Sequence, residues 1–145
     1  MKALIQRVNH AKVTVEEKVV GEIGQGILIL LGIDKEDNES KIKPLADKVL
    51  NLRIFAGEGG EFDRSSIDTH GEILVVSQFT LSGKCEKGRR PDFFGAAAPF
   101  LAKDLYLKFV DQLKKSGLKV ATGKFQAMMK VDLENDGPAT FIIEK

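Results

Sequence analysis

The stretch 73–81 constrains the fold of this chain more than any other part of the sequence. Four consecutive apolar residues, 73–76, follow a His-Gly turn signal and favour a buried strand. Side chains that donate and accept hydrogen bonds come next, around an aromatic ring: Ser77, Gln78, Phe79 and Thr80. A polar run at the end of a core strand conflicts with burial, and such conflicts tend to mark functional sites. Ordinary strand-edge residues would give the same pattern.

Length and composition favour one globular domain spanning residues 1–145. Hydrophobic residues make up 43% of the chain and charged residues 30%. No apolar run approaches the ~20 residues that cross a bilayer, so we expect no membrane partner. The start passes directly into strand-like sequence, so we expect no targeting peptide. The single cysteine, Cys85, agrees with a reducing cytoplasmic setting. With two histidines and one cysteine, we expect no metal and no cofactor.

The charge distribution is locally basic, although the formal net charge is only +1. Four cations stand against Glu86 alone in one short segment: Lys84, Lys87, Arg89 and Arg90. Six lysines lie between residues 103 and 124, against Asp104 and Asp111. Such segments can steer a polyanion to one face, or can simply solvate a helix.

The remaining pattern predicts a mixed α/β domain with a curved sheet packed against two helices. Strands are predicted at 2–9, 12–16, 19–23 and 27–33, followed by a helix over 40–52 and a short strand at 53–55. A mobile loop at 57–63 and an edge strand at 65–68 precede the strand 72–81. A basic loop at 82–92 leads to a second helix that starts near Pro99 and has Gly117 at its C′ position. A strand at 119–121 and a hairpin with strands 129–134 and 139–143 complete the chain.

Familiar catalytic and nucleotide-binding motifs are absent. A serine-hydrolase triad at Ser77 or Thr80 would need a base, and His10 and His70 are the only imidazoles. No Gly-x-Ser-x-Gly elbow surrounds Ser77. The glycines at 57–60 lack the strand-to-helix context of a phosphate loop.

The segment 135–140 is the second candidate for function. Its sequence, Asn-Asp-Gly-Pro-Ala-Thr, fits a plain hairpin turn. It also fits a rigid unit in which Gly137 allows close approach, Pro138 fixes φ, and backbone carbonyls point at a ligand amine. Only ~5–6% of X-Pro bonds are cis, so the sequence leaves the isomer open.

The two candidate segments together resemble the paired motifs of the D-aminoacyl-tRNA deacylase (D-tyrosyl-tRNA deacylase) family. Ser77-Gln-Phe-Thr80 and Gly137-Pro-Ala-Thr140 carry the resemblance. Further matching segments, in order, are Gln6-Arg-Val8, Asn51-Leu-Arg-Ile-Phe55, Lys87-Gly-Arg-Arg-Pro91, Phe125-x-Ala127-x-Met129 and Asn135-Asp136. The similarity covers essentially the full chain. Ala139 departs from the family, which more often has Val there.

The resemblance implies a barrel-like fold and a homodimer whose active sites lie at the subunit interface. It implies hydrolysis of the ester between a D-amino acid, and potentially glycine, and the terminal ribose of tRNA. Gly137-Pro138 would be a cis-proline filter that enters the partner's pocket and rejects L-amino acids. Such exclusion by a rigid wall suits specificity against one enantiomer.

Roles for the matched residues also follow from the resemblance. The catalytic segment is Ser77, Gln78, Phe79 and Thr80, with the Phe79 or Thr80 N–H as oxyanion donor. Either Thr80 or the substrate 2′-OH would relay the proton. The substrate-binding set is Gly137, Pro138, Ala139, Thr140, Arg7, Phe125, Ala127 and Met129. The tRNA phosphates would meet Lys84, Lys87, Arg89 and Arg90; no DNA partner is expected.

Two other functions compete with this interpretation. A non-catalytic RNA-binding module would retain tRNA without ester turnover. A generic esterase would cleave simple esters without tRNA. Neither alternative predicts a preference for D over L substrates.

Overall fold

The computed structural model describes residues 1–86 and 88–145, so Lys87, a predicted tRNA contact, lies outside the described residues. The elements in chain order are β1 (Lys2–Val15), β2 (Lys18–Ile23), β3 (Gly26–Gly32), η1 (Glu39–Lys41), α1 (Ile42–Leu50), β4 (Phe55–Gly57), β5 (Gly60–Arg64), α2 (Ser66–Thr69), β6 (Glu72–Ser77), η2 (Phe79–Ser82), α3 (Pro99–Lys114), β7 (Val120–Thr122) and β8 (Lys130–Glu144).

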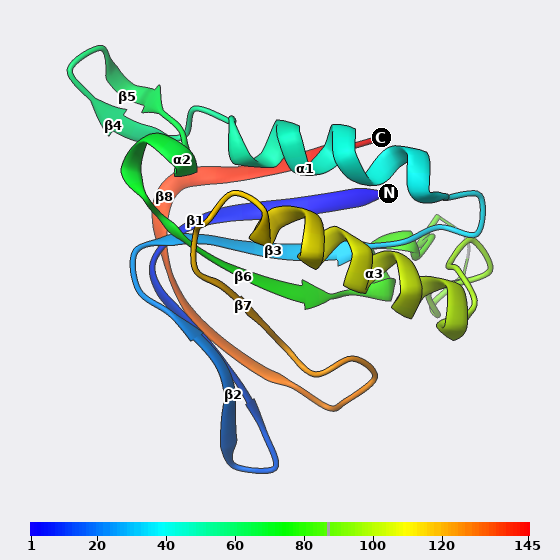
Figure 1. Ribbon diagram of the computed structural model, residues 1–145. Coiled ribbons are helices and arrows are strands. Elements are labelled where there is room, and N and C mark those ends of the chain that lie inside the picture. The colour runs from blue at the N-terminus through cyan, green and yellow to red at the C-terminus, as the bar shows by residue number, and fades with distance from the viewer. Residues whose placement is uncertain (87) are drawn as a thin grey trace.

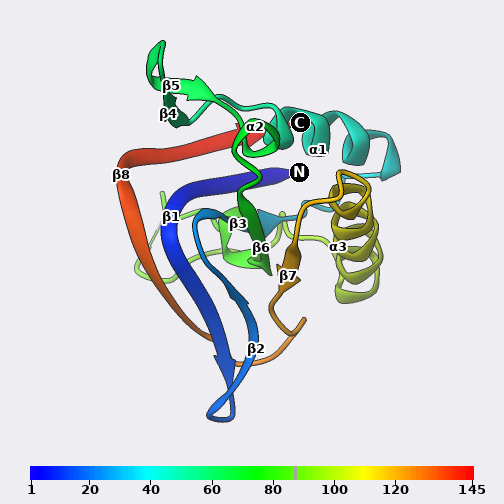
Figure 2. The ribbon, with the colours of Figure 1, turned by 60° about the vertical axis from the view of Figure 1, so that its left-hand side comes forward.

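Strand β1 is the centre of the main sheet. Its first half pairs with β3, its second half pairs with β2, and β8 runs antiparallel along its other edge. Beyond β3 the sheet continues through parallel pairs to β6 and β7. Figures 1 and 2 show that the sheet curves strongly, so that β8, β1 and β2 wrap toward β7. The predicted mixed α/β architecture with a barrel-like sheet is therefore confirmed.

Two apolar cores lie on the two faces of this curved sheet. Helices α1 and α3 pack side by side over one face (Figure 1) and bury Leu45, Val49 and Phe109 against β1, β3 and β6. The second core fills the inside of the curve, where Val8, Val13 and Leu28 are among the buried residues. Strand β3 is buried on both faces because each core takes one of them, as its continuous apolar sequence predicts.

Helix α3 begins and ends for local reasons. Pro99 stands in its first turn, where the missing N–H costs no hydrogen bond. Leu105, Phe109 and Leu113, four residues apart, form its buried stripe. The helix is capped at Lys115, so Gly117 stands two residues beyond the cap, one position farther than the predicted C′. Its φ of +80 is the left-handed conformation that glycine adopts readily.

The segment 53–69 differs from its prediction. Residues 57–63 belong to a β-hairpin of β4 and β5, not to an irregular loop, and the first of these strands starts at Phe55. Residues 65–68 form no edge strand. They start α2, because the side chains and amides of Ser65 and Asp68 bond reciprocally in a capping box.

Two further predictions were wrong. Strand β6 ends at Ser77, and residues 79–82 turn into a 3₁₀ helix, so 72–81 is not one strand. The C-terminus is not a hairpin: β8 is one 15-residue strand paired along β1. The extra residues at 135–139 are absorbed by register shifts opposite Gln6–His10, which bend the strand without reversing it. The strands predicted at 2–9 and 12–16 are accordingly one strand, β1.

Asp37 forms a buried ion pair that ties the sheet to the segment before α1. Its Oδ1 lies 2.6 Å from the amino group of Met1 and 2.6 Å from Lys41 Nζ, and its Oδ2 accepts the Asp34 N–H at 2.7 Å. Burial acts to raise the pKa of this carboxyl, but these hydrogen bonds outweigh it and leave the pKa lowered from 3.8.

Asp37→Asn should lower the free energy of unfolding by on the order of 3 kcal/mol at neutral pH, because it leaves two cations without their carboxylate. Because folding lowers the pKa of Asp37, its contribution is complete above 3.8 and is lost as the pH falls through the lower folded value. Urea unfolding measured between about pH 3 and pH 7 should therefore show a shallower acid decline in the variant than in the wild type.

Asp47→Asn is the matched control, because Asp47 forms an exposed i,i+4 pair with Lys43. It should change the free energy of unfolding by no more than ~0.5 kcal/mol. Equal effects of the two substitutions would contradict the importance of the buried pair.

Candidate functional site

The first predicted motif forms a tight turn at the end of β6. The Gln78 N–H donates to the Leu31 carbonyl at 2.9 Å, which is the last bond to β3. The next bond runs from the Leu81 N–H to the Gln78 carbonyl at 3.2 Å, so the amides of Phe79 and Thr80 precede the bonded part of the turn. Gly32 permits this approach, because a Cβ there would stand 2.9 Å from Leu81 Cβ.

A cleft of about 560 Å³ opens beside this turn. Its lining comes from the end of β6, the segment before α3, the start of α3 and the loop before β8: Val76, Ser77, Gln78, Phe79, Ala96, Ala97, Pro99, Ala102, Phe125, Gln126, Ala127, Met128, Met129 and Val131. Ser77, Gln78 and Phe79 thus meet Phe125, Ala127 and Met129, as expected of one site. Thr80 lies outside the lining, and Gln78 Nε2 hydrogen-bonds its hydroxyl.

Aromatic contacts fix two walls of the cleft. Phe79, 57% exposed, packs edge-to-face on Phe93 with ring centroids 5.0 Å apart. Phe125 lies 5.8 Å from the ring of Tyr106, whose hydroxyl donates to the Val75 carbonyl at 2.9 Å. Burial raises the pKa of Tyr106 to about 12, so this phenol is neutral at physiological pH and serves as a support for the wall.

The sequence prediction missed the walls formed by residues 96–102 and by Gln126, Met128 and Val131. The run of alanines before Pro99 was a usable signal, since small side chains before a helix leave space for a ligand. For Met128, which is 93% exposed, the sequence alone contains no signal that it lines the cleft.

The described lining of the cleft carries few reactive groups. Among the described residues that line it, none has an ionisable side chain. No group of three or more His, Cys, Asp or Glu residues in the described part of the chain could hold a metal ion. What the cleft offers a reaction is therefore the polar groups of Ser77, Gln78 and Gln126 and the turn at Phe79, within a largely apolar lining.

The second predicted motif lies elsewhere, in the bend of β8. Gly137 and Pro138 are exposed, and the peptide bond between them is cis. The buried guanidinium of Arg7 supports this bend: Nη1 donates to the Ile54 carbonyl at 2.6 Å, and Nε lies 3.1 Å from the Asp136 carbonyl and 2.7 Å from its Oδ2. The Asn135 side chain adds a bond to the Arg7 carbonyl at 3.0 Å.

The other residues of the second motif have separate surroundings. Ala139 is fully buried, so its methyl group packs inside the protein instead of facing a ligand. Thr140 is exposed on β8, where its hydroxyl accepts a hydrogen bond from Gln6 Nε2 at 3.3 Å. Within this motif, Gly137 and Pro138 are therefore the residues whose backbone is exposed to solvent in the bend.

The two motifs are far apart within one chain. The bend lies opposite Gln6–Val8 on β1, which pairs with Gly26–Leu28 on β3, beside the beginning of β6. The turn lies at the other end of β6. Three strand spacings of ~4.8 Å, from β8 across β1 and β3 to β6, separate the two motifs across the sheet. At least four residues of ~3.3 Å separate them along β6, so the bend and the turn are roughly 20 Å apart. Neither Gly137 nor Pro138 is among the residues that line the cleft.

Of the predicted phosphate contacts that the structure describes, Lys84, Arg89 and Arg90 are exposed and do not line the cleft. Lys84 pairs with Asp92 through backbone bonds of 2.8 and 2.9 Å, which closes the loop that carries Arg89 and Arg90. This loop adjoins Phe93 and therefore the Phe79 side of the cleft.

Comparison with known proteins points to one family. The family model described as D-Tyr-tRNA(Tyr) deacylase matches residues 4–144. A D-aminoacyl-tRNA deacylase of Thermosipho africanus is 54% identical over 144 residues, which cover 99% of this chain and 97% of that protein.

Two solved structures share the fold. The c-Myc DNA Unwinding Element Binding Protein has a TM-score of 0.92 at 43% identity and covers 100% of this chain and 99% of its own. A probable eukaryotic D-amino acid tRNA deacylase has a TM-score of 0.84 at 18% identity, with 98% and 97% covered. No helix among the described residues is long and apolar enough to span a membrane.

Arg7→Ala should lower the free energy of unfolding by about 2–4 kcal/mol, because it leaves the buried Ile54 carbonyl without its donor and Asp136 without its cation. Amide hydrogen exchange at residues 135–139 should become faster, while exchange in α3 stays as in the wild type. Denaturant unfolding and hydrogen exchange with mass spectrometry measure the two effects.

Gln6→Ala is the control on the neighbouring residue, since the Gln6 bond to Thr140 is exposed. It should leave both quantities near the wild-type values. Unchanged exchange at 135–139 in Arg7→Ala would refute the assignment of Arg7 as the support of the bend.

Proposed function

The chain belongs to the D-Tyr-tRNA(Tyr) deacylase family and is a D-aminoacyl-tRNA deacylase, an ester hydrolase; from this premise we propose how its two motifs act. The reaction frees tRNA from a D-amino acid in the cytoplasm, and L-aminoacyl-tRNA is spared. Glycyl-tRNA is also a substrate, because a filter that rejects an L side chain has nothing to reject in glycine.

The turn at Phe79 and Thr80 beside the cleft is the observation that carries this proposal. Ester hydrolysis develops negative charge on the carbonyl oxygen, and fixed N–H groups stabilise that charge. The amides of Phe79 and Thr80 precede the bonded part of the turn and are suited to this task. They would act as the oxyanion donors.

The absence of ionisable side chains from the described lining of the cleft favours substrate assistance. An aminoacyl ester is already reactive: a water attacks its carbonyl carbon, the bond to the 3′ oxygen breaks, and the neighbouring ribose 2′-OH can relay the proton lost by the water to that leaving oxygen. Thr80, whose hydroxyl bonds to Gln78 outside the cleft, then positions Gln78 and is not a covalent nucleophile. Ser77 shapes the base of the same turn.

The apolar cleft binds the terminal adenosine. Its volume of about 560 Å³ suits a nucleoside, which is mostly flat and apolar on its faces. Phe125 and Met129 contact the base, Ala127 leaves room for it, and Gln78 orients the ester by hydrogen bonding.

The Gly137-Pro138 bend is the chiral filter, and it acts on the cleft of a second copy. The α-amino group of the substrate lies within a few ångströms of the reacting carbonyl, whereas the bend and the cleft are roughly 20 Å apart in one chain. A homodimer removes this mismatch by bringing the bend of one protomer to the cleft of its partner. The carbonyls of the bend would then accept hydrogen bonds from the α-amino group and crowd the position of an L side chain.

The supporting residues of the filter are Arg7, Ala139 and Thr140, which hold the bend in β8 from three directions. The exposed Lys84, Arg89 and Arg90, together with Lys87, contact tRNA phosphates. Such contacts make binding weaker as salt increases.

Purified protein should release D-tyrosine from D-tyrosyl-tRNA at least about a hundredfold faster than L-tyrosine from the matched L ester, because the filter excludes the L side chain. Release is followed by acid-gel separation of charged and free tRNA. Equal cleavage of both esters would leave an esterase without a filter. Retention of tRNA without cleavage would leave a binding module.

A mixture of two inactive variants tests whether the site is shared between protomers. Ala102→Trp fills the cleft, since Ala102 lines it. Gly137→Val adds bulk to the bend, where a Cβ meets only Asn135 Oδ1 at 3.4 Å. Each homodimer should be inactive. Random reassociation should restore about a quarter of the wild-type activity, since half the dimers then hold one intact site.

Mixtures of either variant with itself are the controls for that experiment and should stay inactive. If the filter served the cleft of its own chain, every chain in the mixture would carry one defect. The mixture would then remain inactive, which would refute the shared site.

A further inference from the structure

Two phenylalanine rings beside the cleft are exposed without an assigned role. Phe94 is 81% exposed and Phe100 is 89% exposed. Between them in sequence lie Ala96, Ala97 and Pro99, which line the cleft, so both rings belong to the segment that forms one of its walls. Leaving large aromatic rings in water forfeits the free energy of burying them, which is typical of a surface that binds something.

The segment that carries Phe94 is held in place by its backbone. The Phe94 N–H donates to Asp92 Oδ1 at 2.7 Å, and the neighbouring Gly95 carbonyl accepts the Lys35 N–H at 3.0 Å. The Ala97 N–H donates to the Ile33 carbonyl at 2.9 Å. Phe94 is therefore presented by a fixed loop, so a ligand would not have to order it.

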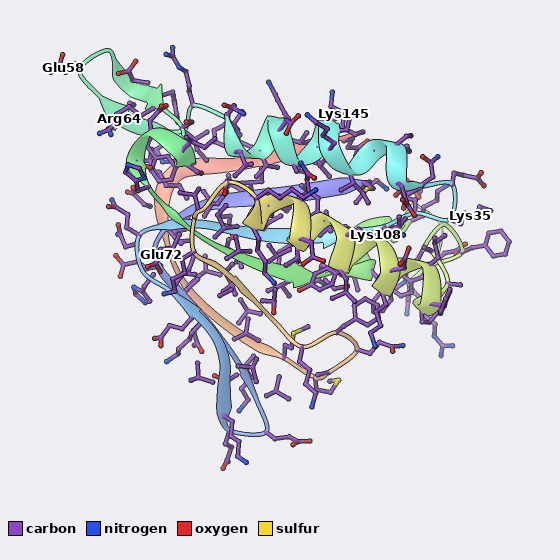
Figure 3. All side chains as sticks on the ribbon, in the orientation of Figure 1. Lys35, Glu58, Arg64, Glu72, Lys108 and Lys145 are labelled. Atoms are coloured by element: carbon purple, nitrogen blue, oxygen red, sulfur yellow. The ribbon has the colours of Figure 1, made fainter. Side chains whose placement is uncertain are left out.

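One lysine lies near each ring. Lys35 Nζ lies 4.5 Å from the centroid of the Phe94 ring, and Figure 3 shows Lys35 at the end of the molecule where α3 begins. Lys103 is exposed one turn after Phe100 on α3. Carboxylates lie near the rings as well: Asp92 accepts the Phe94 N–H, Asp104 pairs with Lys108, and Glu36 and Glu86 are exposed.

We propose that Phe94 and Phe100 form a stacking platform for the unpaired nucleotides that precede the terminal adenosine at the 3′ end of tRNA, with Lys35 and Lys103 on their phosphates. This inference rests on the proposed function, because it extends the strand that enters the cleft. Aromatic faces beside cations are the common means of holding single-stranded nucleic acid without reading its sequence. The contact of Lys35 with the face of Phe94, and Lys103 one turn after Phe100, favour an anionic strand over a protein partner.

The test compares two substrates that differ only in these nucleotides: D-tyrosyl-tRNA and the D-tyrosyl ester of adenosine. Phe94→Ala and Phe100→Ala should each raise KM for the tRNA substrate about tenfold, within the range found for loss of one stacked base. The same variants should change KM for the adenosine ester by less than about twofold, because that substrate does not reach the platform. Phe94→Trp and Phe100→Trp should retain the wild-type KM for tRNA.

Leu107→Ala is the matched control, because Leu107 is a 49% exposed apolar residue on the same helix, outside the cleft lining. It should behave as the wild type with both substrates. An equal rise in KM for both substrates, or none for tRNA, would overturn the platform while leaving the deacylase activity intact. A change in sedimentation of the alanine variants would show that the rings contact another protomer, and would also overturn it.

Binding of uncharged tRNA separates this inference from the proposed function. Fluorescence anisotropy with labelled tRNA should show about tenfold weaker binding by Phe94→Ala than by the wild type, whatever the rate of hydrolysis. If the wild type binds tRNA but cleaves no D ester, the proposed function fails and the platform stands. If Phe94→Ala and Phe100→Ala bind as the wild type does, the platform fails.

Discussion

The pairing of β1 on both of its edges is the constraint on which the rest of this structure depends. One strand contacts β3, β2 and β8, so its register sets where each of them lies. A shift by one residue would turn Arg7 from the β8 bend toward the opposite face, together with Ala3 and Ile5, which are buried on the same face of β1. The same register determines the distance between the bend and the turn at Phe79. Strand β1 contains neither candidate motif, yet its pairing sets the positions of both the turn at 77–80 and the bend at 137–140.

The sparse chemistry of the cleft fits the reaction proposed for it. A stable bond would require a strong base or a metal ion, whereas an aminoacyl ester is reactive enough that orientation and two backbone amides contribute most of what is needed. Backbone amides have the further advantage that no rotamer or protonation state has to be set. Their position is fixed by the Gln78 bond to Leu31 and by the close approach that Gly32 permits. The selectivity then has to come from a separate rigid element.

The sequence predicted the elements with strong periodicity and missed those decided by pairing. Helix α3 and strand β3 follow from apolar spacing and from Pro99. The β8 bend could not be predicted, because Asn-Asp-Gly-Pro is equally good turn sequence. Only the pairing along the whole length of β1 shows that the chain continues as one strand through the bend. Ser77 to Thr80 could be proposed as a candidate site from the polarity of the segment. Its 3₁₀ geometry depends on tertiary contacts that local sequence does not encode, whereas the alanine run before Pro99 was a signal for the wall at 96–102 that the prediction did not use.

The bend is exposed and yet well supported, as the chiral filter proposed for it requires. Gly137 and Pro138 lie in solvent, yet Arg7 beneath them is 5% exposed and bonds to both Ile54 and Asp136. The guanidinium has a fixed planar fork, so it holds the strand β8 and the segment before β4 at a set separation, which a single ammonium could not do. An exposed bend that is held by buried side chains is suited to contact another molecule. Because the cleft of its own chain lies roughly 20 Å away, that molecule is best explained as a substrate held by a second copy.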